Sequence, residues 1–229
     1  LSDNARVVLE KRYLRKDSSG EIVETPEGML RRVAHAIAKA EHQYGPGDDA
    51  RQVEEDFYGI MASLEFVPNS PTLMNAGTGA GTLSACFVLG LDDSMDGIMT
   101  TAKEAAMVQK FGGGTGFSLS PIRPKGARIK TPHGKACGPI AVLRHLSSVS
   151  KLVTQGGKRD GANMAVMDVH HPDIMDFITC KTQEGQIHNF NISVGATDEF
   201  MQAVKDGTDY ALRSKVKPSD PDSPMMEVG

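Results

Sequence analysis

Several residue types that mark particular protein classes are scarce in this sequence. It has no tryptophan, 5% aromatic residues and only three cysteines among 229 residues. Cys86, Cys137 and Cys180 form no Cys-x-x-Cys pair, which excludes a zinc ribbon and a disulfide scaffold. No stretch approaches the run of about 18 apolar residues that a membrane span needs, and the N-terminal residues lack an apolar secretory core. We therefore expect a cytoplasmic protein with no membrane partner.

An excess of positive charge is missing too. The formal net charge is −4, with 25 basic and 29 acidic residues, so no global field attracts a nucleic-acid polymer. The apolar fraction of 39% and the charged fraction of 24% are those of an ordinary globular chain, long enough for one large or two small domains. A modest excess of glycine and proline, 24 and 12 residues, predicts many tightly shaped loops.

The first part of the chain reads as helical. Apolar residues recur at helical spacing, and we expect three helices over about residues 3–14, 25–45 and 50–64. Asp3 is the predicted cap of the first helix. Thr25 is the predicted N-cap of the second, with Pro26 at the first helical position, where its missing N–H costs nothing. Together these helices form a cap or subdomain.

From residue 83 the pattern alternates between short apolar runs and helical periodicity. The predicted strands cover residues 83–89, 116–119, 162–169 and 189–194, and the predicted helices cover 95–111, 139–154, 172–181 and 198–204. Four successive strand–helix units imply a mostly parallel sheet, doubly wound or closed into a barrel, with strands buried on both faces. The terminal stretch 212–229 is rich in proline and aspartate without a period, which indicates a loop or a strand edge.

Glycines gather between a predicted helix and a predicted strand, at positions 112, 113, 114 and 116. A dinucleotide fingerprint needs the opposite order, strand, glycines and helix, and no Gly-Lys-Ser/Thr follows as a P-loop would require. Two interpretations stay open: a helix end with a tight return, or bare backbone amides that admit a ligand closely.

Two further segments could carry chemistry. Residues 122–135 contain five basic side chains and no acidic one, and residues 155–161, QGGKRDG, place Lys158 and Arg159 among three glycines. The first is either a site for a phosphorylated small molecule or a solvated basic loop. The second either binds a phosphate or a base edge or is a plain connection.

The cysteines and the adjacent histidines give weaker signals. By residue type alone, Cys86 on a predicted strand and Cys180 in a predicted helix favour core packing, since free cysteine commonly behaves as a small buried hydrophobe. Cys137 cannot be interpreted alone. His170 and His171 precede a helix, and neighbouring strand positions point to opposite faces, so the pair argues against metal chelation.

Seven ordered motifs resemble the catalytic chain of ribonucleotide reductases. They cover nearly the whole chain and are PNSPTLMNAG (68–77), LSACFVL (83–89), DDSMDGI (92–98), KFGGGTGFSLSPIRPKG (110–126), TQGGKRDGANM (154–164), HPDIMDFITCK (171–181) and NFNISV (189–194). The residues in these motifs are most similar to those of the adenosylcobalamin-dependent class, class II. The spacing between the motifs also fits the class whose radical comes from a partner subunit. The resemblance implies an N-terminal helical domain, residues 1–66, followed by the first half of a ten-stranded α/β barrel, residues 67–229.

The resemblance also assigns roles around the ribose. Cys86 matches the strand cysteine that reduces the ribose and pairs as a disulfide with a distant second cysteine, which reverses the interpretation from residue type. Removal of the 2′-hydroxyl consumes two electrons, and a dithiol supplies them as it becomes a disulfide. The positions that match the lining of the substrate site are Ser70, Ala85, Gly114, Gln155 and Arg159.

An allosteric role is implied for other residues. Asp93 matches the residue that holds the deoxyribose of a nucleotide effector, and Arg123 and Lys130 match its phosphate contacts. Residues 155–163 match the element that lies between effector and substrate and reads the base, with Gln155 and Arg159 as its polar readers. Two sites biased by one element are what allostery requires.

Departures from the family pattern are equally informative. The family's radical-bearing cysteine lies in an Asn-x-Cys-x-Glu loop, and no such string occurs here. The second redox cysteine is missing as well, because neither Cys137 nor Cys180 has the family's neighbours, and so are the C-terminal thiol pair and an N-terminal ATP-binding cone. The chain also starts at Leu1 rather than Met. We expect part of a reductase that is inactive by itself: a gene fragment, a split subunit or a truncated product.

We therefore expect the N-terminal part of a ribonucleoside-diphosphate or triphosphate reductase, which makes deoxyribonucleotides for DNA synthesis by thiyl-radical chemistry. Its partners would be a ribonucleotide substrate, a deoxynucleotide effector and the remaining C-terminal part, with a homodimer as one option. Adenosylcobalamin would bind mostly outside this segment, and we expect no metal site. The alternatives are a cobalamin-independent class I chain and a nucleotide-binding regulatory fragment without activity.

Overall fold

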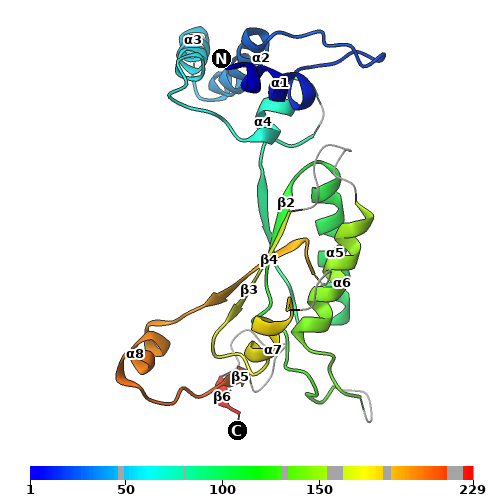
Figure 1. The fold of residues 1–229 in the computed structure, drawn as a ribbon, viewed down its shortest axis with the longest axis vertical. Helices are drawn as coiled ribbons and strands as arrows, with labels where there is room; N and C mark the ends of the chain where they lie inside the picture. The colour runs from blue at the N-terminus through cyan, green and yellow to red at the C-terminus, as the bar shows by residue number, and fades with distance from the viewer. Residues whose placement is uncertain are drawn as a thin grey trace. The chain divides into compact units, whose positions relative to one another are not determined.

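The fold was obtained as a computed structural model, shown in Figure 1, which describes residues 1–45, 49–79, 81–129, 134–153, 162–182, 187–215 and 224–228. By compactness the chain divides into two units, Leu1–Ala85 and Cys86–Gly229. Each unit has its own hydrophobic core. The expected domain boundary after residue 66 stays a prediction. Within the described ranges, no helix combines the length and apolarity needed to cross a bilayer.

The first unit is helical, as predicted. Its elements are α1 (Asp3–Arg12), α2 (Pro26–Ala38), the 3₁₀ helix η1 (Lys39–Gln43), α3 (Asp49–Ala62) and α4 (Ser70–Asn75). Thr25 caps α2 as predicted, because its Oγ1 accepts the Gly28 N–H at 3.1 Å. The cap of α1 is Ser2 rather than the predicted Asp3. Helix α4 was not predicted, since six residues are too few to show a period; in the structure Asn69 is its N-cap, and Asn69 Oδ1 accepts the Thr72 N–H at 3.0 Å.

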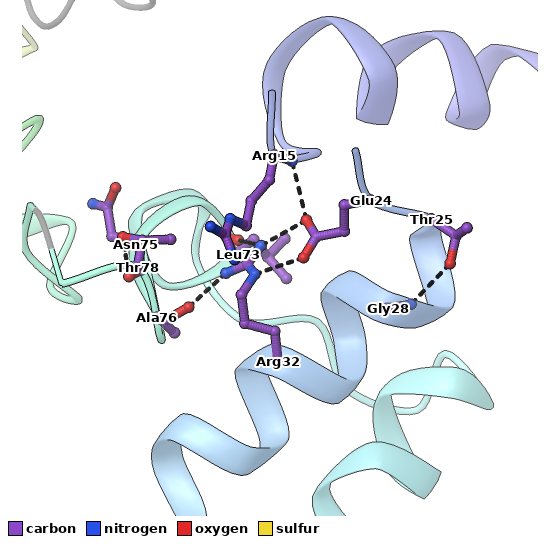
Figure 2. A network of polar contacts seen from close by, with 9 residues as sticks. All are labelled: Arg15, Glu24, Thr25, Gly28, Arg32, Leu73, Asn75, Ala76 and Thr78. Atoms are coloured by element: carbon purple, nitrogen blue, oxygen red, sulfur yellow. Dashed lines mark hydrogen bonds and ion pairs between the residues drawn. The ribbon is translucent and has the colours of Figure 1, made fainter. Parts of the chain in front are cut away.

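Arg32, which forms a buried ion pair with Glu24, fastens α4 to α2. Figure 2 shows Arg32 of α2 between the carboxylate of Glu24 and the chain around the end of α4. Its Nε donates to Glu24 Oε1 at 2.7 Å, and its terminal nitrogens donate to the carbonyl oxygens of Leu73 and Ala76 at 3.2 and 2.5 Å. Both charged side chains are only 9% exposed. Arg32 thereby holds the PNSPTLMNAG segment in place.

The carboxylate of Glu24 stays ionised in this setting. Burial acts to raise its pKa, but hydrogen bonds from Arg32 and from the backbone N–H of Arg15, together with the charge of Arg32, outweigh burial and lower the pKa on balance. A charged acceptor is what the guanidinium needs when both groups leave water.

Replacing Glu24 by alanine should destabilise the first unit by about 3 kcal/mol, because Arg32 would be left buried without its counter-ion. Chemical denaturation followed by the helical circular dichroism signal measures the loss. Glu55→Ala is the matched control, since the Arg31–Glu55 pair is solvent-exposed and should change stability little. Equal losses in the two variants would contradict this account.

The second unit is built on a parallel sheet. Its strands are β1 (Cys86–Leu89), β2 (Gly114–Ser118), β3 (Asn163–Asp168) and β4 (Phe190–Gly195), hydrogen-bonded in the order β1-β2-β3-β4. The helices are α5 (Met95–Lys110), α6 (Pro139–Leu152), α7 (Ile174–Thr179) and α8 (Asp198–Asp206). A doubly wound sheet reverses its strand order, whereas here every strand joins its predecessor, as in a singly wound barrel. The predicted α/β class is confirmed.

The two faces of the sheet differ in how far they are buried. Figure 1 shows α5 and α6 side by side along the sheet. Inward positions such as Phe117, Ala165 and Phe190 are buried in the core. On the opposite face Cys86, Val88 and Met164 are exposed. Burial on both faces, expected from the sequence, therefore holds for one face only among the described residues.

The end of the chain contains a small hairpin. Strands β5 (Arg213–Lys215) and β6 (Met225–Glu227) pair antiparallel. The backbone N–H of Arg213 donates to the carbonyl oxygen of His170 at 2.6 Å. The hairpin is therefore tied to the turn that follows β3. For these terminal residues, 212–229, the sequence predicted a loop or a strand edge.

Candidate functional site

Cys86 begins β1, directly opposite Gly114 of β2 in the parallel register. Its thiol is exposed, so the interpretation as core packing, made from residue type, is wrong. Gly114 is buried and has no side chain, so backbone alone lies opposite Cys86 on the neighbouring strand. A ligand at Cys86 would meet that backbone closely.

The glycine run is a tight return from α5 into β2. The backbone N–H groups of Gly112 and Gly113 donate to carbonyl oxygens of the last turn of α5, at 2.9 and 3.1 Å, and Gly112 has φ +91°. A Cβ on Gly113 would lie 2.7 Å from Val108 and 2.8 Å from Phe87. The helix-end interpretation is thus correct, and the same turn delivers Gly114 to its place beside Cys86.

Two other residues predicted to line the substrate site precede β1 in the chain. Ala85 immediately precedes Cys86 in the chain and is half-buried. Ser70 opens α4 in the first unit, and its Oγ lies 2.8 Å from the hydroxyl of Tyr13. Gln155 and Arg159 fall outside the described residues, as does Lys130.

Asp93 and Arg123, predicted to bind one ligand, do lie together. Asp93 follows β1 and Arg123 follows β2, and the carboxyl ends of parallel strands share one sheet edge. Arg123 donates from its backbone N–H to Asp93 Oδ1 at 3.2 Å and from Nε to Oδ2 at 2.7 Å. The Asp93 side chain is 6% exposed and that of Arg123 21%. A guanidinium has five N–H donors, so it can bind a phosphate while Asp93 holds it.

The described parts of the basic segment after Arg123, residues 125–129 and 134–138, run antiparallel to each other, and we call them the basic arm. The backbone N–H of Gly126 donates to the carbonyl oxygen of Ala136 at 2.9 Å, and Arg128 bridges to Lys135. Lys125, Arg128 and Lys135 are exposed. Their charges are thus available to an anionic ligand beside Arg123.

A buried polar network lies at the amino ends of the strands, and no sequence pattern predicted it. Gln109 Nε2 donates to Thr115 Oγ1 at 3.0 Å and to Asn163 Oδ1 at 2.8 Å, and the Thr115 hydroxyl donates to Asn163 Oδ1 at 2.7 Å. Asn163 Nδ2 continues to Ser150 Oγ at 2.7 Å. These four residues are at most 3% exposed. The network fixes Thr115, the neighbour of Gly114.

The other cysteines differ in access. Cys137 is exposed, whereas Cys180, at the end of α7, is 8% exposed, and burial raises the pKa of its thiol. Core packing, predicted for Cys180, is confirmed. Across the described residues no group of three or more His, Cys, Asp or Glu side chains is arranged to hold a metal ion.

Comparison with known families accounts for both units. Residues 1–81 match the all-alpha domain of ribonucleotide reductase, and residues 84–227 match its barrel domain. The chain belongs to the ribonucleotide reductase family. The resemblance of the sequence motifs to this family is confirmed, and so is the expected order of a helical part and a barrel part.

Individual relatives narrow the class. The chain is 46% identical over 206 residues to a vitamin B12-dependent ribonucleoside-diphosphate reductase of Mycobacterium tuberculosis and 39% identical to one of Thermoplasma acidophilum, covering 90% and 92% of this chain. Identity to the ribonucleoside-diphosphate reductase large subunit of Danio rerio is 35%, over 89% of this chain and 25% of that one. The predicted similarity to the B12-dependent class is confirmed.

The fold is also similar to that of a solved ribonucleotide reductase structure. The alpha subunit of the Actinobacillus ureae class Id ribonucleotide reductase superposes with a TM-score of 0.72 at 26% identity, covering 90% of this chain and 35% of that chain. The chain spans 30% and 34% of the Mycobacterium and Thermoplasma reductases.

Native alkylation should separate the three thiols. Iodoacetamide is expected to modify Cys86 and Cys137 in the folded chain and Cys180 only after denaturation, because a buried thiol with a raised pKa is neither accessible nor ionised. Peptide mass spectrometry reads the labelling. Protection of Cys86 in the native chain would contradict the described geometry.

Thr115→Val should lower the free energy of unfolding of the second unit by roughly 1 to 3 kcal/mol, because it leaves one buried amide N–H of Gln109 without its acceptor and removes one of the two donors to Asn163 Oδ1. Thr115→Ser keeps the hydroxyl and should lose less. Thermal denaturation compares the two, and a valine variant as stable as wild type would show that the network contributes nothing.

Proposed function

We propose that this chain provides the nucleotide-handling part of a ribonucleotide reductase, with Cys86 as one of the two thiols that reduce the ribose. The observation that carries the proposal is the exposed Cys86 thiol opposite Gly114. Two thiols and a ribonucleotide give a disulfide, a deoxyribonucleotide and water, so the pair supplies two electrons while the 2′-hydroxyl leaves as water. The substrate is a ribonucleoside diphosphate or triphosphate.

The reductant role needs a second cysteine. Neither Cys137 nor Cys180 has the neighbours of that residue in the family, and Cys180 is buried at the end of α7. We therefore assign the second thiol, and the cysteine that bears the radical, to the remaining part of the reductase. Its thiyl radical would remove the 3′-hydrogen of the ribose before the thiols act.

Substrate and effector would occupy opposite ends of the strands. Ser70, Ala85 and Gly114, with Gln155 and Arg159, are proposed to line the substrate. Asp93, Arg123 and Lys130 are proposed to bind the sugar and phosphates of a deoxynucleotide effector. The buried carboxylate of Asp93 supports this, because it orients the Arg123 guanidinium and offers oxygens to a sugar hydroxyl.

Adenosylcobalamin is the expected radical source of the full enzyme, and its homolysis would supply the radical. Three cavities lined by described residues measure about 250 to 410 Å³, the range of a drug-sized ligand, so none of these three fits a corrin ring with its nucleotide tail. We place the cofactor on the remaining C-terminal part. A homodimer and a cytoplasmic location complete the proposal.

A second candidate is a nucleotide-binding regulatory fragment without turnover. The absence of an Asn-x-Cys-x-Glu string from this sequence favours it. The two candidates share the nucleotide sites and differ only in whether Cys86 takes part in chemistry.

Reconstitution separates the candidates. The chain would be mixed with the complementary C-terminal part of a B12-dependent reductase, a dithiol reductant and adenosylcobalamin, and deoxynucleotide would be measured. We expect product from the mixture, none from the chain alone, and none with Cys86→Ser, because one thiol cannot deliver two electrons.

Cys137→Ser is the matched control, since Cys137 is equally exposed but lies outside the proposed chemistry. It should leave product formation unchanged. Product with Cys86→Ser would refute the reductant role. Product that depends on a di-metal subunit in place of cobalamin would assign the chain to the partner-radical class.

A further inference from the structure

His171 is a buried histidine with both ring nitrogens engaged. Its side chain belongs to the turn between β3 and α7, and the residue is 3% exposed. Nδ1 accepts the backbone N–H of Asp173 at 3.0 Å, so the ring proton lies on Nε2, which donates to the carbonyl oxygen of Ile122 at 2.8 Å. Ile122 directly precedes Arg123. The ring therefore holds the backbone from which Arg123 extends.

Asp173, two residues on, binds the start of the basic arm and lies close to its end. Its Oδ2 accepts the backbone N–H of Lys125 at 2.8 Å. Gly138, at the other end of the arm, has φ +78°, and a Cβ there would lie 3.0 Å from the same Oδ2 and 2.8 Å from Lys125 Cβ. The carboxylate thus packs where the arm starts and where it ends, and only glycine fits at the exit.

Arg123 is consequently fixed from two directions. Asp93 binds its backbone N–H and guanidinium from the turn after β1. His171 and Asp173 hold its neighbours Ile122 and Lys125 from the turn after β3. Three successive strand ends therefore converge on one arginine, which preorganises it for an anion.

We propose that His171 and Asp173 are positioning residues that set Arg123 and the basic arm for the phosphates of a nucleoside triphosphate effector. This inference rests on the proposed effector site. Neither residue touches the nucleotide; both act through the backbone of residues 122–125.

Protonation gives the anchor a distinctive pH dependence. Burial lowers the pKa of His171 below its ordinary 6.5, while the carbonyl oxygen of Ile122 and the charge of Asp173 oppose burial; His170 and Asp168 are the other titratable groups near the ring. The neutral ring makes both hydrogen bonds, whereas a protonated Nδ1 would face the Asp173 N–H, donor against donor. As the pH falls below 6.5 the anchor should weaken, although a plain basic patch would gain charge and bind anions more tightly.

The test uses the whole chain and four proteins: wild type, His171→Gln, His171→Phe and Asp173→Asn. Calorimetry measures the affinity for deoxynucleoside triphosphates from about pH 7.5 to about pH 5.5, across the histidine range. Nuclear magnetic resonance measures hydrogen exchange at Arg123 Nε–H, a measurement that can be made without any nucleotide. Glutamine can accept from Asp173 and donate to Ile122 without titrating, so it is the rescuing variant.

We expect His171→Phe to weaken nucleotide binding about tenfold, the effect of about one lost hydrogen bond, and to accelerate exchange at Arg123 Nε–H. Asp173→Asn keeps an acceptor oxygen for the Lys125 N–H but loses the charge, so it should act in the same direction with a smaller effect. His171→Gln should match wild type at neutral pH and lose less affinity on acidification. The phosphate groups of the nucleotide titrate at about pH 6 whichever variant binds it, so the difference between the two pH profiles reports protonation of the His171 ring.

Unchanged affinity and exchange in folded His171→Phe would overturn the inference, as would identical pH profiles for wild type and His171→Gln. If His171→Phe fails to fold, those two profiles decide. If wild type binds no deoxynucleotide, the proposed effector site is refuted, and exchange at Arg123 Nε–H in His171→Phe, which removes both ring hydrogen bonds, then decides whether the anchor exists.

Discussion

The pairing of β1 with β2 is the constraint on which the candidate sites depend. The parallel register sets Cys86 against Gly114 at one end of the strands, and the same register brings Asp93 and Arg123 together beyond the other end. Strand β1 has four residues, about 13 Å at the rise of a strand. A slip by one residue would turn the Cys86 side chain toward the helices. Thiol and ion pair are therefore positioned by one set of backbone hydrogen bonds.

Two devices protect that pairing. At the amino ends, the buried Gln109, Thr115 and Asn163 side chains join α5, β2 and β3. Buried polar groups tolerate few alternative arrangements, because each misplacement leaves a donor or acceptor unsatisfied. Beyond the carboxyl ends, the turns after β1, β2 and β3 are tied together through Asp93, Arg123 and His171.

The sequence predicted those features that depend on local chemistry. Thr25 and Pro26 defined the start of α2, and the alternation of periods predicted each of the four parallel strands and the helices between them. The strand order could not be derived, because it depends on which edges meet in space. The exposure of Cys86 could not be derived from residue type either, since period-two alternation identifies two faces without saying which one the helices cover; only the family motifs indicated it. The network at Asn163 was missed because it joins residues 54 positions apart that share no repeat.

The sequential strand order has a consequence for how the sheet assembles. Each strand pairs with the one synthesised just before it, so the ladder can extend stepwise as the polypeptide leaves the ribosome, with short loop closures at every step. The outer edges of β1 and β4 pair with no strand among the described residues, and their backbone amides and carbonyls form templates for further strands. Chaperone engagement and edge-to-edge association should therefore concentrate at Cys86–Leu89 and Phe190–Gly195 until those edges are covered.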